Sequence, residues 1–217
     1  MSKLITFIFC INLLQGEGAE DISFRYGFMG QLKSNPDSTV VLSDSSVIHT
    51  GDRVRINIGY IREYDFLLIF KDSQGEFDIL YSAPIKMGAQ SSEATKQDTF
   101  ATALHWALFR DPPGEESFYL INSKSPLSYL TKLLSRYDSA PNKAKIKLAK
   151  KIQVELDALD PNAKAELSSI ASRLDKPLVG GVTFRGDGDD ELKDMSLTHE
   201  CRGTGGIAFI KIVLNHK

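Results

Sequence analysis

A histidine and a cysteine two positions apart are the side chains in this sequence best placed for catalysis. They lie in residues 199–203 (HECRG), where His199 precedes Cys201. Side chains at positions i and i+2 of a strand share one face, so the imidazole can lie beside the thiol. An imidazole that removes the thiol proton produces a thiolate nucleophile. One hypothesis for this chain is therefore a cysteine hydrolase that uses Cys201 with His199 or with the distant His105.

An acidic, glycine-containing segment offers oxygen ligands for a metal ion. Residues 186–191 (GDGDDE) carry four carboxylates, and hard cations such as Ca²⁺ require several oxygen ligands. The EF-hand spacing is missing, however, and a solvated hairpin loop is the favoured interpretation. The glycines of residues 203–206 (GTGG) precede a predicted strand rather than a helix, which does not suit phosphate binding. We predict no catalytic set, no cofactor and no metal site.

A lysine-rich segment carries the densest positive charge. The predicted helix 142–159 has five lysines in its first half, at Lys143, Lys145, Lys147, Lys150 and Lys151. Such a face is usually solvated, and the alternative is an anionic partner or a lipid headgroup. Because no aromatic residues are interleaved with these lysines, we predict no nucleic-acid partner.

The single tryptophan lies beside a histidine in residues 100–109. The favoured interpretation is a strand with core aromatics, since tryptophan and histidine are commonly partly buried. The alternative is a ligand-stacking ring, Trp106, beside a general base, His105. No further residue in the sequence supports that second interpretation.

The elements that must position these residues are organised around residues 51–82, which predict three consecutive antiparallel strands. Residues 52–60 and 76–81 alternate apolar with polar side chains, the period of a strand with one buried face. Residues 66–70 (FLLIF) have no polar face, which indicates burial on both sides. Residues 71–75 (KDSQG) supply a hairpin turn between the last two strands. Another layer must therefore cover the second face of residues 66–70.

Three predicted helices can provide that layer. Ser125 is expected to cap the first helix, with Pro126 at its first position. The second helix is predicted over residues 142–159. The third begins after Asp160 and carries Leu167, Ile170 and Leu174 on one face.

The fold class predicted from these segments is α+β. We expect an antiparallel β-sandwich-like core, residues 23–123 and 178–215, with a three-helix insertion, residues 125–175, before the last strands. Residues 207–214 (IAFIKIVL) predict a central strand buried on both faces. The chain of 217 residues is 42% apolar and 25% charged with a net charge of −2, which is ordinary for one globular domain over residues 19–217.

The first residues have the pattern of a secretory signal peptide. Lys3 precedes eleven apolar or uncharged residues, 4–14, and small residues follow. We predict a signal peptide over residues 1–18, cleavage after Gly18 and a periplasmic or secreted protein. The alternative is a cytosolic N-terminal strand or helix. Export would leave Cys201 as the single cysteine, without an internal disulfide, and no apolar run reaches the length of about 20 residues that a transmembrane helix needs.

Several strand starts and turns carry a family resemblance. They are residues 51–55 (GDRVR), 64–70 (YDFLLIF), 79–81 (ILY), 111–115 (DPPGE) and 118–123 (FYLINS). Together they resemble domain-of-unknown-function family 4384, a bacterial family found in envelope proteins and attached to caspase-like peptidase or kinase domains. The resemblance spans roughly residues 39 to 130. It implies a fold and a compartment, and it supplies no functional residues.

That resemblance directs attention back to Cys201. Residues 201–203 (CRG) match the end of the caspase signature Q-A-C-R-G. A caspase nucleophile follows a buried strand and has its histidine about 50 residues upstream, whereas residues 195–200 are not such a strand and His105 is much farther away. We expect a cysteine in a turn or at a strand edge.

The favoured hypothesis is an exported, non-enzymatic binding or accessory module of the bacterial cell envelope, which recognises a protein or another envelope component. A cysteine hydrolase remains the alternative. Attachment to a membrane surface through the lysine-rich helix is a third class.

Overall fold

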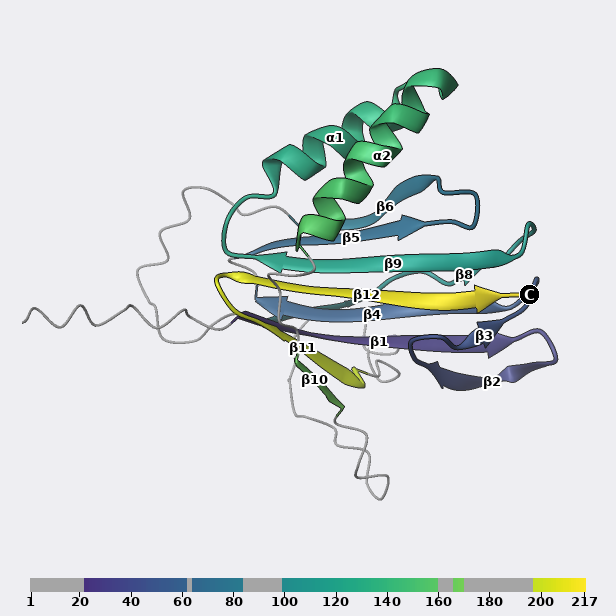
Figure 1. Cartoon of the computed structure of the whole chain (residues 1–217). Coiled ribbons are helices and arrows are strands. Elements are labelled where there is room, and N and C mark those ends of the chain that lie inside the picture. Colours follow the sequence, from purple (N-terminus) through teal and green to yellow (C-terminus); the bar gives the residue numbers. More distant parts are fainter. Residues whose placement is uncertain (1–21, 62–63, 84–98, 160–165, 170–196) are drawn as a thin grey trace, which may run out of the picture.

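The computed structural model describes residues 22–61, 64–83, 99–159, 166–169 and 197–217. The predicted signal peptide (1–18) and the acidic loop 186–191 fall outside these residues, as do residues 178–196 of the predicted second core segment. The described chain is a β-rich α+β structure with two sheets and two helices (Figure 1).

Two sheets form the framework. The first, sheet A, has the order β10-β11-β1-β4-β7, with β2 beside β1 and β8 beside β4, and the second, sheet B, has the order β3-β12-β9-β5-β6. Sheet A contains β1 (Ile22–Leu32), β2 (Asn35–Leu42), β4 (Arg53–Ile61), β7 (Thr99–Ala103), β8 (Ala107–Leu108), β10 (Glu166–Ser169) and β11 (His199–Gly203). Sheet B contains β3 (Val47–Ile48), β5 (Asp65–Lys71), β6 (Phe77–Ala83), β9 (Gly114–Ser123) and β12 (Ile207–His216).

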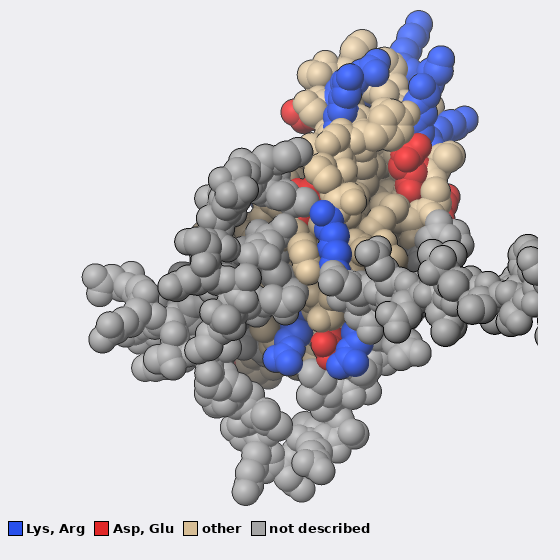
Figure 2. All heavy atoms as spheres, turned by 90° about the vertical axis from the view of Figure 1, so that its left-hand side faces the viewer, with Lys and Arg blue, Asp and Glu red and all other residues tan. Residues whose placement is uncertain are grey.

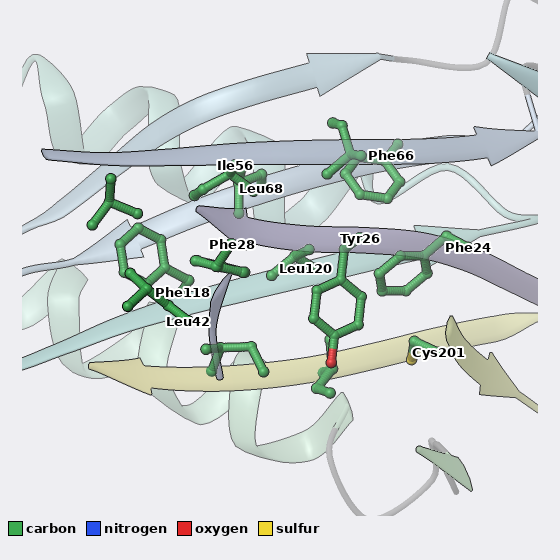
Figure 3. Packing of buried hydrophobic residues seen from close by; sticks show 14 of the residues in the cluster. Phe24, Tyr26, Phe28, Leu42, Ile56, Phe66, Leu68, Phe118, Leu120 and Cys201 are labelled. Carbon is green, nitrogen blue, oxygen red and sulfur yellow. The ribbon is translucent and has the colours of Figure 1, made fainter. Parts of the chain in front are cut away.

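The sheets face each other across an aromatic-rich core. Phe24 of β1 meets Phe66 of β5 edge-to-face at 5.3 Å between ring centroids, and Phe28 meets Phe118 of β9 at 5.2 Å (Figure 3). Edge-to-face ring pairs stabilise a core beyond the contribution of the apolar area that they bury. The pairings within the sheets are antiparallel except that β3 runs parallel to β12.

Burial of β5 on both faces is confirmed. Phe66 and Leu68 lie in the core between the sheets, whereas Leu67 and Ile69 lie in a second core beneath the helices. None of these four side chains is more than 2% exposed. An uninterrupted apolar run is therefore what this position in the fold requires.

The expected succession of three neighbouring strands is only half right. β5 and β6 form the predicted hairpin, but β4 lies in the opposite sheet and β9 takes the other side of β5. The patterns explain the difference. β4 has one continuous apolar face, with Val54, Ile56, Ile58 and Tyr60 in the core. This pattern suits a sheet whose other side is not covered by a helix of the described residues (Figure 1). β5 is apolar on both faces and suits the sheet that the helices cover.

Two helices cover sheet B, α1 (Ser128–Asp138) and α2 (Asn142–Leu159), as Figure 1 shows. The bounds of α2 agree with the prediction. Leu130, Leu134 and Tyr137 of α1, and Ile152 and Leu156 of α2, are buried against the sheet.

The predicted third helix is wrong where the structure describes it. Residues Glu166–Ser169 form β10, which pairs antiparallel with β11 so that Leu167 lies opposite Cys201. Hydrogen bonding to the edge of β11 prevails here over the helical spacing of Leu167, Ile170 and Leu174, because tertiary context overrides a weak local preference. Residues 170–175 lie outside the described chain.

The predicted cap of the first helix is also wrong. α1 begins at Ser128, and the backbone N–H of Leu127 donates to Asp65 Oδ2 at 2.7 Å. The carbonyl of Ser125 instead accepts the hydroxyl of Ser123 at 2.7 Å. Ser125 precedes a proline, which disfavours helical backbone at that residue. A carboxylate from β5, distant in sequence, therefore serves the start of the helix.

β12 is central in its sheet, between β3 and β9, as predicted. Ala208, Ile210, Ile212 and Leu214 line the core between the sheets. On the opposite face Phe209 is buried beneath the helices, but Lys211 is exposed. Burial on both faces is thus confirmed only at the Phe209 end, because the helices do not extend over the rest of the strand.

A buried aspartate joins two turns. Asp52 is 3% exposed, and its two carboxylate oxygens accept the backbone N–H groups of Lys33 and His49, each at 2.8 Å. The carboxylate therefore holds the β1–β2 turn against the segment that leads into β4. Hydrogen bonds to a charged acceptor are stronger than neutral ones.

We expect Asp52→Ala to lower the free energy of unfolding by about 3 kcal/mol, since it leaves two N–H groups without their acceptor. Urea denaturation followed by circular dichroism measures the change. Asp37→Ala, at an exposed position of β2, is the control and should change stability by less than about 0.5 kcal/mol. Equal losses in the two variants would show that Asp52 is not a structural tie.

Candidate functional site

Cys201 is a core residue. It lies at the centre of β11, opposite Phe24 of β1, and is 0% exposed. Its Sγ donates to the carbonyl of Phe209 at 3.5 Å. Burial raises the pKa of the thiol to about 12, with the nearby charge of Glu200 as a smaller cause. The expectation of a turn or strand-edge cysteine is therefore wrong, because the thiol points into the two-sheet core (Figure 3).

The histidines do not complete a catalytic pair with this thiol. His199 stacks on Tyr26 with 5.3 Å between ring centroids, and burial lowers the pKa of His199. The thiol hydrogen is directed to a backbone carbonyl rather than to this imidazole. His105 is exposed on the segment between β7 and β8. A protonated, inaccessible thiol cannot act as a nucleophile.

The glycine of the Cys-Arg-Gly segment has a structural reason. A Cβ on Gly203 would lie 1.9 Å from the carbonyl oxygen of Ile207, so only glycine fits where β11 approaches β12. The match to the end of a caspase signature therefore reflects a core cysteine followed by a close backbone contact.

We expect Cys201 in the Cys10→Ser background to react with Ellman's reagent at pH 8 about a thousandfold more slowly in the native state than in guanidinium. Burial and the raised pKa leave few accessible thiolates in the native protein, whereas an unfolded thiol has an ordinary pKa. Stopped-flow absorbance measures both rates. Native labelling at the unfolded rate would restore the hydrolase hypothesis.

A cavity of about 310 Å³ opens between the edges of the two sheets, and we call it the edge cavity. β6 of sheet B and β8 of sheet A form its sides, and the β5–β6 turn and the first residues of β9 close it. Its apolar walls are Phe70, Leu80, Phe109 and Phe118. It lies toward the end of the fold where the C-terminus is marked in Figure 1, since β9 begins opposite the last residues of β12.

A buried polar pair stands at the inner wall of the edge cavity. Glu116 of β9 lines the cavity, and its Oε1 lies 3.4 Å from Nδ1 of His216 on β12. The side chains are 5% and 0% exposed. His216 Nε2 is 2.9 Å from Thr50 Oγ1, and that hydroxyl donates to Asp111 Oδ1 at 2.8 Å. Four residues from three distant parts of the sequence thus form one hydrogen-bonded series.

The hydrogen bonds of Thr50 show which nitrogen of His216 carries a hydrogen. Thr50 has one hydroxyl hydrogen, which Asp111 accepts, so Thr50 Oγ1 must accept the hydrogen of His216 Nε2. His216 Nδ1 faces Glu116 Oε1 at 3.4 Å, so the ring also contacts the carboxyl group through its second nitrogen. Burial raises the pKa of Glu116, and the hydrogen bond to His216 opposes this effect.

The second oxygen of Glu116 has no hydrogen-bond donor in the described part of the chain. A backbone hydrogen bond from Ser73 to the carboxyl group is a further, smaller cause that lowers the pKa of Glu116. A buried carboxyl oxygen without a donor is energetically costly. Such a group at the wall of a cavity is a mark of a binding site.

None of these four residues was predicted as a site residue from the sequence, although the sequence contains a signal for two of them. The inward-facing residues of β12 are Ala208, Ile210, Ile212 and Leu214, and His216 continues the same alternation. On β9, Glu116 precedes the inward-facing Phe118 and Leu120. A polar residue at the end of each inward series indicates a polar group within the core.

The lysines of α2 form a separate surface. Lys143, Lys147, Lys150 and Lys151 are exposed, whereas Lys145 forms an ion pair with Glu76 at 3.7 Å. Figure 2 shows Lys and Arg side chains gathered over the helical end of the molecule. Tyr129, Ile146 and Val154 of the two helices are more than half exposed.

The predicted aromatic strand over residues 100–109 is divided into β7 and β8. Trp106 lies between them and is half-buried, with the guanidinium carbon of Arg55 5.9 Å from its ring centre. Phe109 of this segment is a core aromatic residue and is 7% exposed.

Comparison with known proteins gives no relative: no family model, curated protein or solved structure matches the chain. The resemblance to family 4384 therefore stays a prediction. Within the described ranges, no helix is long and apolar enough to cross a membrane. The same residues contain no group of three or more His, Cys, Asp or Glu side chains suited to hold a metal ion.

Proposed function

We propose that this protein is an exported, non-enzymatic binding or accessory module of the bacterial cell envelope that recognises a protein or another envelope component. The observation that carries the binding role is the edge cavity, with apolar walls and the buried Glu116–His216 pair at its inner side. Ligand sites commonly combine apolar walls with a few placed polar groups. The envelope assignment rests on the N-terminal pattern and on the family resemblance.

The non-enzymatic part of the proposal rests on Cys201. The hydrolase alternative requires an accessible thiolate beside a base, and Cys201 is buried with a raised pKa. The cysteine and His199 serve the packing of β11 against β1 instead.

Filling the edge cavity should abolish partner recognition. Leu108 of β8 lines the cavity and is 46% exposed, so Leu108→Trp adds bulk at the mouth without disturbing the core. Val41→Trp, at a position of β2 that is 54% exposed and outside the cavity, is the matched control. Immobilised wild-type protein and the control should recover the same envelope proteins, identified by mass spectrometry, and Leu108→Trp should lose them.

Recovery of the same proteins by Leu108→Trp would contradict a role for the cavity. Repeated recovery of no protein or envelope component by the wild type would contradict the binding module itself.

A second candidate function is attachment to an anionic membrane surface. The exposed side chains of Tyr129 and Val154 line a shallow hollow together with Lys147, Lys150 and Lys151. Apolar side chains among lysines suit a headgroup layer, and the electrostatic part of such binding weakens with salt.

We expect the double variant Lys150→Glu, Lys151→Glu to lower binding to phosphatidylglycerol vesicles at least tenfold, because each lysine near the surface contributes about 1 kcal/mol. Vesicle sedimentation at 50 and 300 mM salt measures the binding. Lys33→Glu, Lys217→Glu, two exposed lysines elsewhere, is the control. Binding that ignores both the substitutions and the salt would refute this candidate.

A further inference from the structure

We propose that the edge cavity binds a positively charged organic group, an alkylammonium or a guanidinium, with Glu116 as the buried acceptor at its inner wall. This inference deepens the proposed function and rests on it. The group can belong to a lysine or arginine side chain of a partner protein or to a free amine, and the chemistry is the same.

The charge of the lining favours a cation. Asp72, Asp78 and Asp111 line the cavity together with a single basic residue, Arg110. His216 does not line the cavity, and its imidazole lies beside the carboxyl group of Glu116. A site with one sign of charge and apolar walls concentrates ligands of the opposite sign.

The walls favour an organic cation over a metal ion. No cluster able to hold a metal occurs among the described residues. Phe70, Phe109 and Phe118 present aromatic surface that contacts an aliphatic stem and attracts a cation at its ring face. The volume of about 310 Å³ is at the lower end of the range for small-ligand sites and suits one long side chain.

Glu116 provides the specific contact. Its Oε2 is buried and lacks a donor within the described residues, so the carboxyl group must turn toward the cavity to meet a ligand. An ammonium or guanidinium group carries several N–H donors and no acceptor, which matches this oxygen. A cation at this oxygen favours the ionised carboxylate. Thr50 Oγ1 contacts His216 Nε2 at 2.9 Å and donates to Asp111 at 2.8 Å, and these bonds hold the imidazole beside Glu116.

Titration of the full ¹⁵N-labelled chain by NMR tests the proposal. The probes are n-butylammonium, n-butylguanidinium, and the peptides acetyl-Gly-Lys-Gly-amide and acetyl-Gly-Arg-Gly-amide. The uncharged probes are 1-pentanol and the norleucine peptide of the same length. We expect the cationic probes to shift amide signals of residues around the cavity, including Ser73 and Arg110, at least tenfold more tightly than the uncharged ones.

Two neighbouring glutamates supply a matched comparison. Glu116→Gln should weaken cation binding at least tenfold, while Glu115→Gln should change it less than twofold, because Glu115 is exposed and 4.0 Å from Lys211. If Glu116→Gln does not fold, Leu108→Trp and Asp111→Asn decide, and both should weaken binding at least fivefold. Equal binding of norleucine and lysine peptides, or equal losses in the two glutamate variants, would overturn the proposal.

The NMR titration and the partner-recovery experiment together distinguish this inference from the proposed function. Binding of the peptides supports a protein side chain as the source of the cation, and binding of the free amines alone supports a small molecule. If no cationic probe binds but Leu108→Trp still loses its envelope partner, the cation assignment is overturned and the binding module stands. If Leu108→Trp keeps the partner and cations still bind, the cavity is a cation site apart from that partner.

Discussion

Burial of β5 from both sides is the constraint on which the rest of the structure depends. Phe66 and Leu68 require a facing sheet, and Leu67 and Ile69 require a covering layer. Each fully buried side chain of this size contributes about 2 kcal/mol, so neither layer is dispensable. The facing sheet comes mainly from the first part of the chain and the covering helices from the middle, which explains why segments distant in sequence converge on one short strand.

The hydrogen-bonded residues at the edge cavity include polar groups that are buried at a cost in free energy. Glu116 and His216 lie at the ends of two strands whose preceding inward positions are apolar. Burying a carboxyl group and an imidazole is unfavourable unless each finds a partner. They find each other and, through Thr50, Asp111. Within the described residues, one carboxyl oxygen of Glu116 remains without a donor, and this oxygen is the basis of the proposal for the edge cavity.

Sequence reasoning recovered features that depend on local pattern and lost those that depend on long-range choice. The apolar run of β5 and the spacing of α2 are properties of a few adjacent residues, and both were predicted. The placement of β4 in the opposite sheet, the strand at Glu166–Ser169 and the cap supplied by Asp65 all depend on which distant partner is available. The site was missed for the same reason, because its four residues come together only in the folded chain.

The contact between Asp65 and the start of α1 has a further consequence for β5. A strand with alternating polarity resists slipping by one residue, because the slip would turn its apolar side outward. β5 is apolar on both sides, so that safeguard is missing. The bond from Leu127 to Asp65 and the irregular pairing between Leu68 and Ile69 each mark one position along the strand. The contact at the start of α1 thereby fixes the register of β5, which its own side-chain pattern does not define.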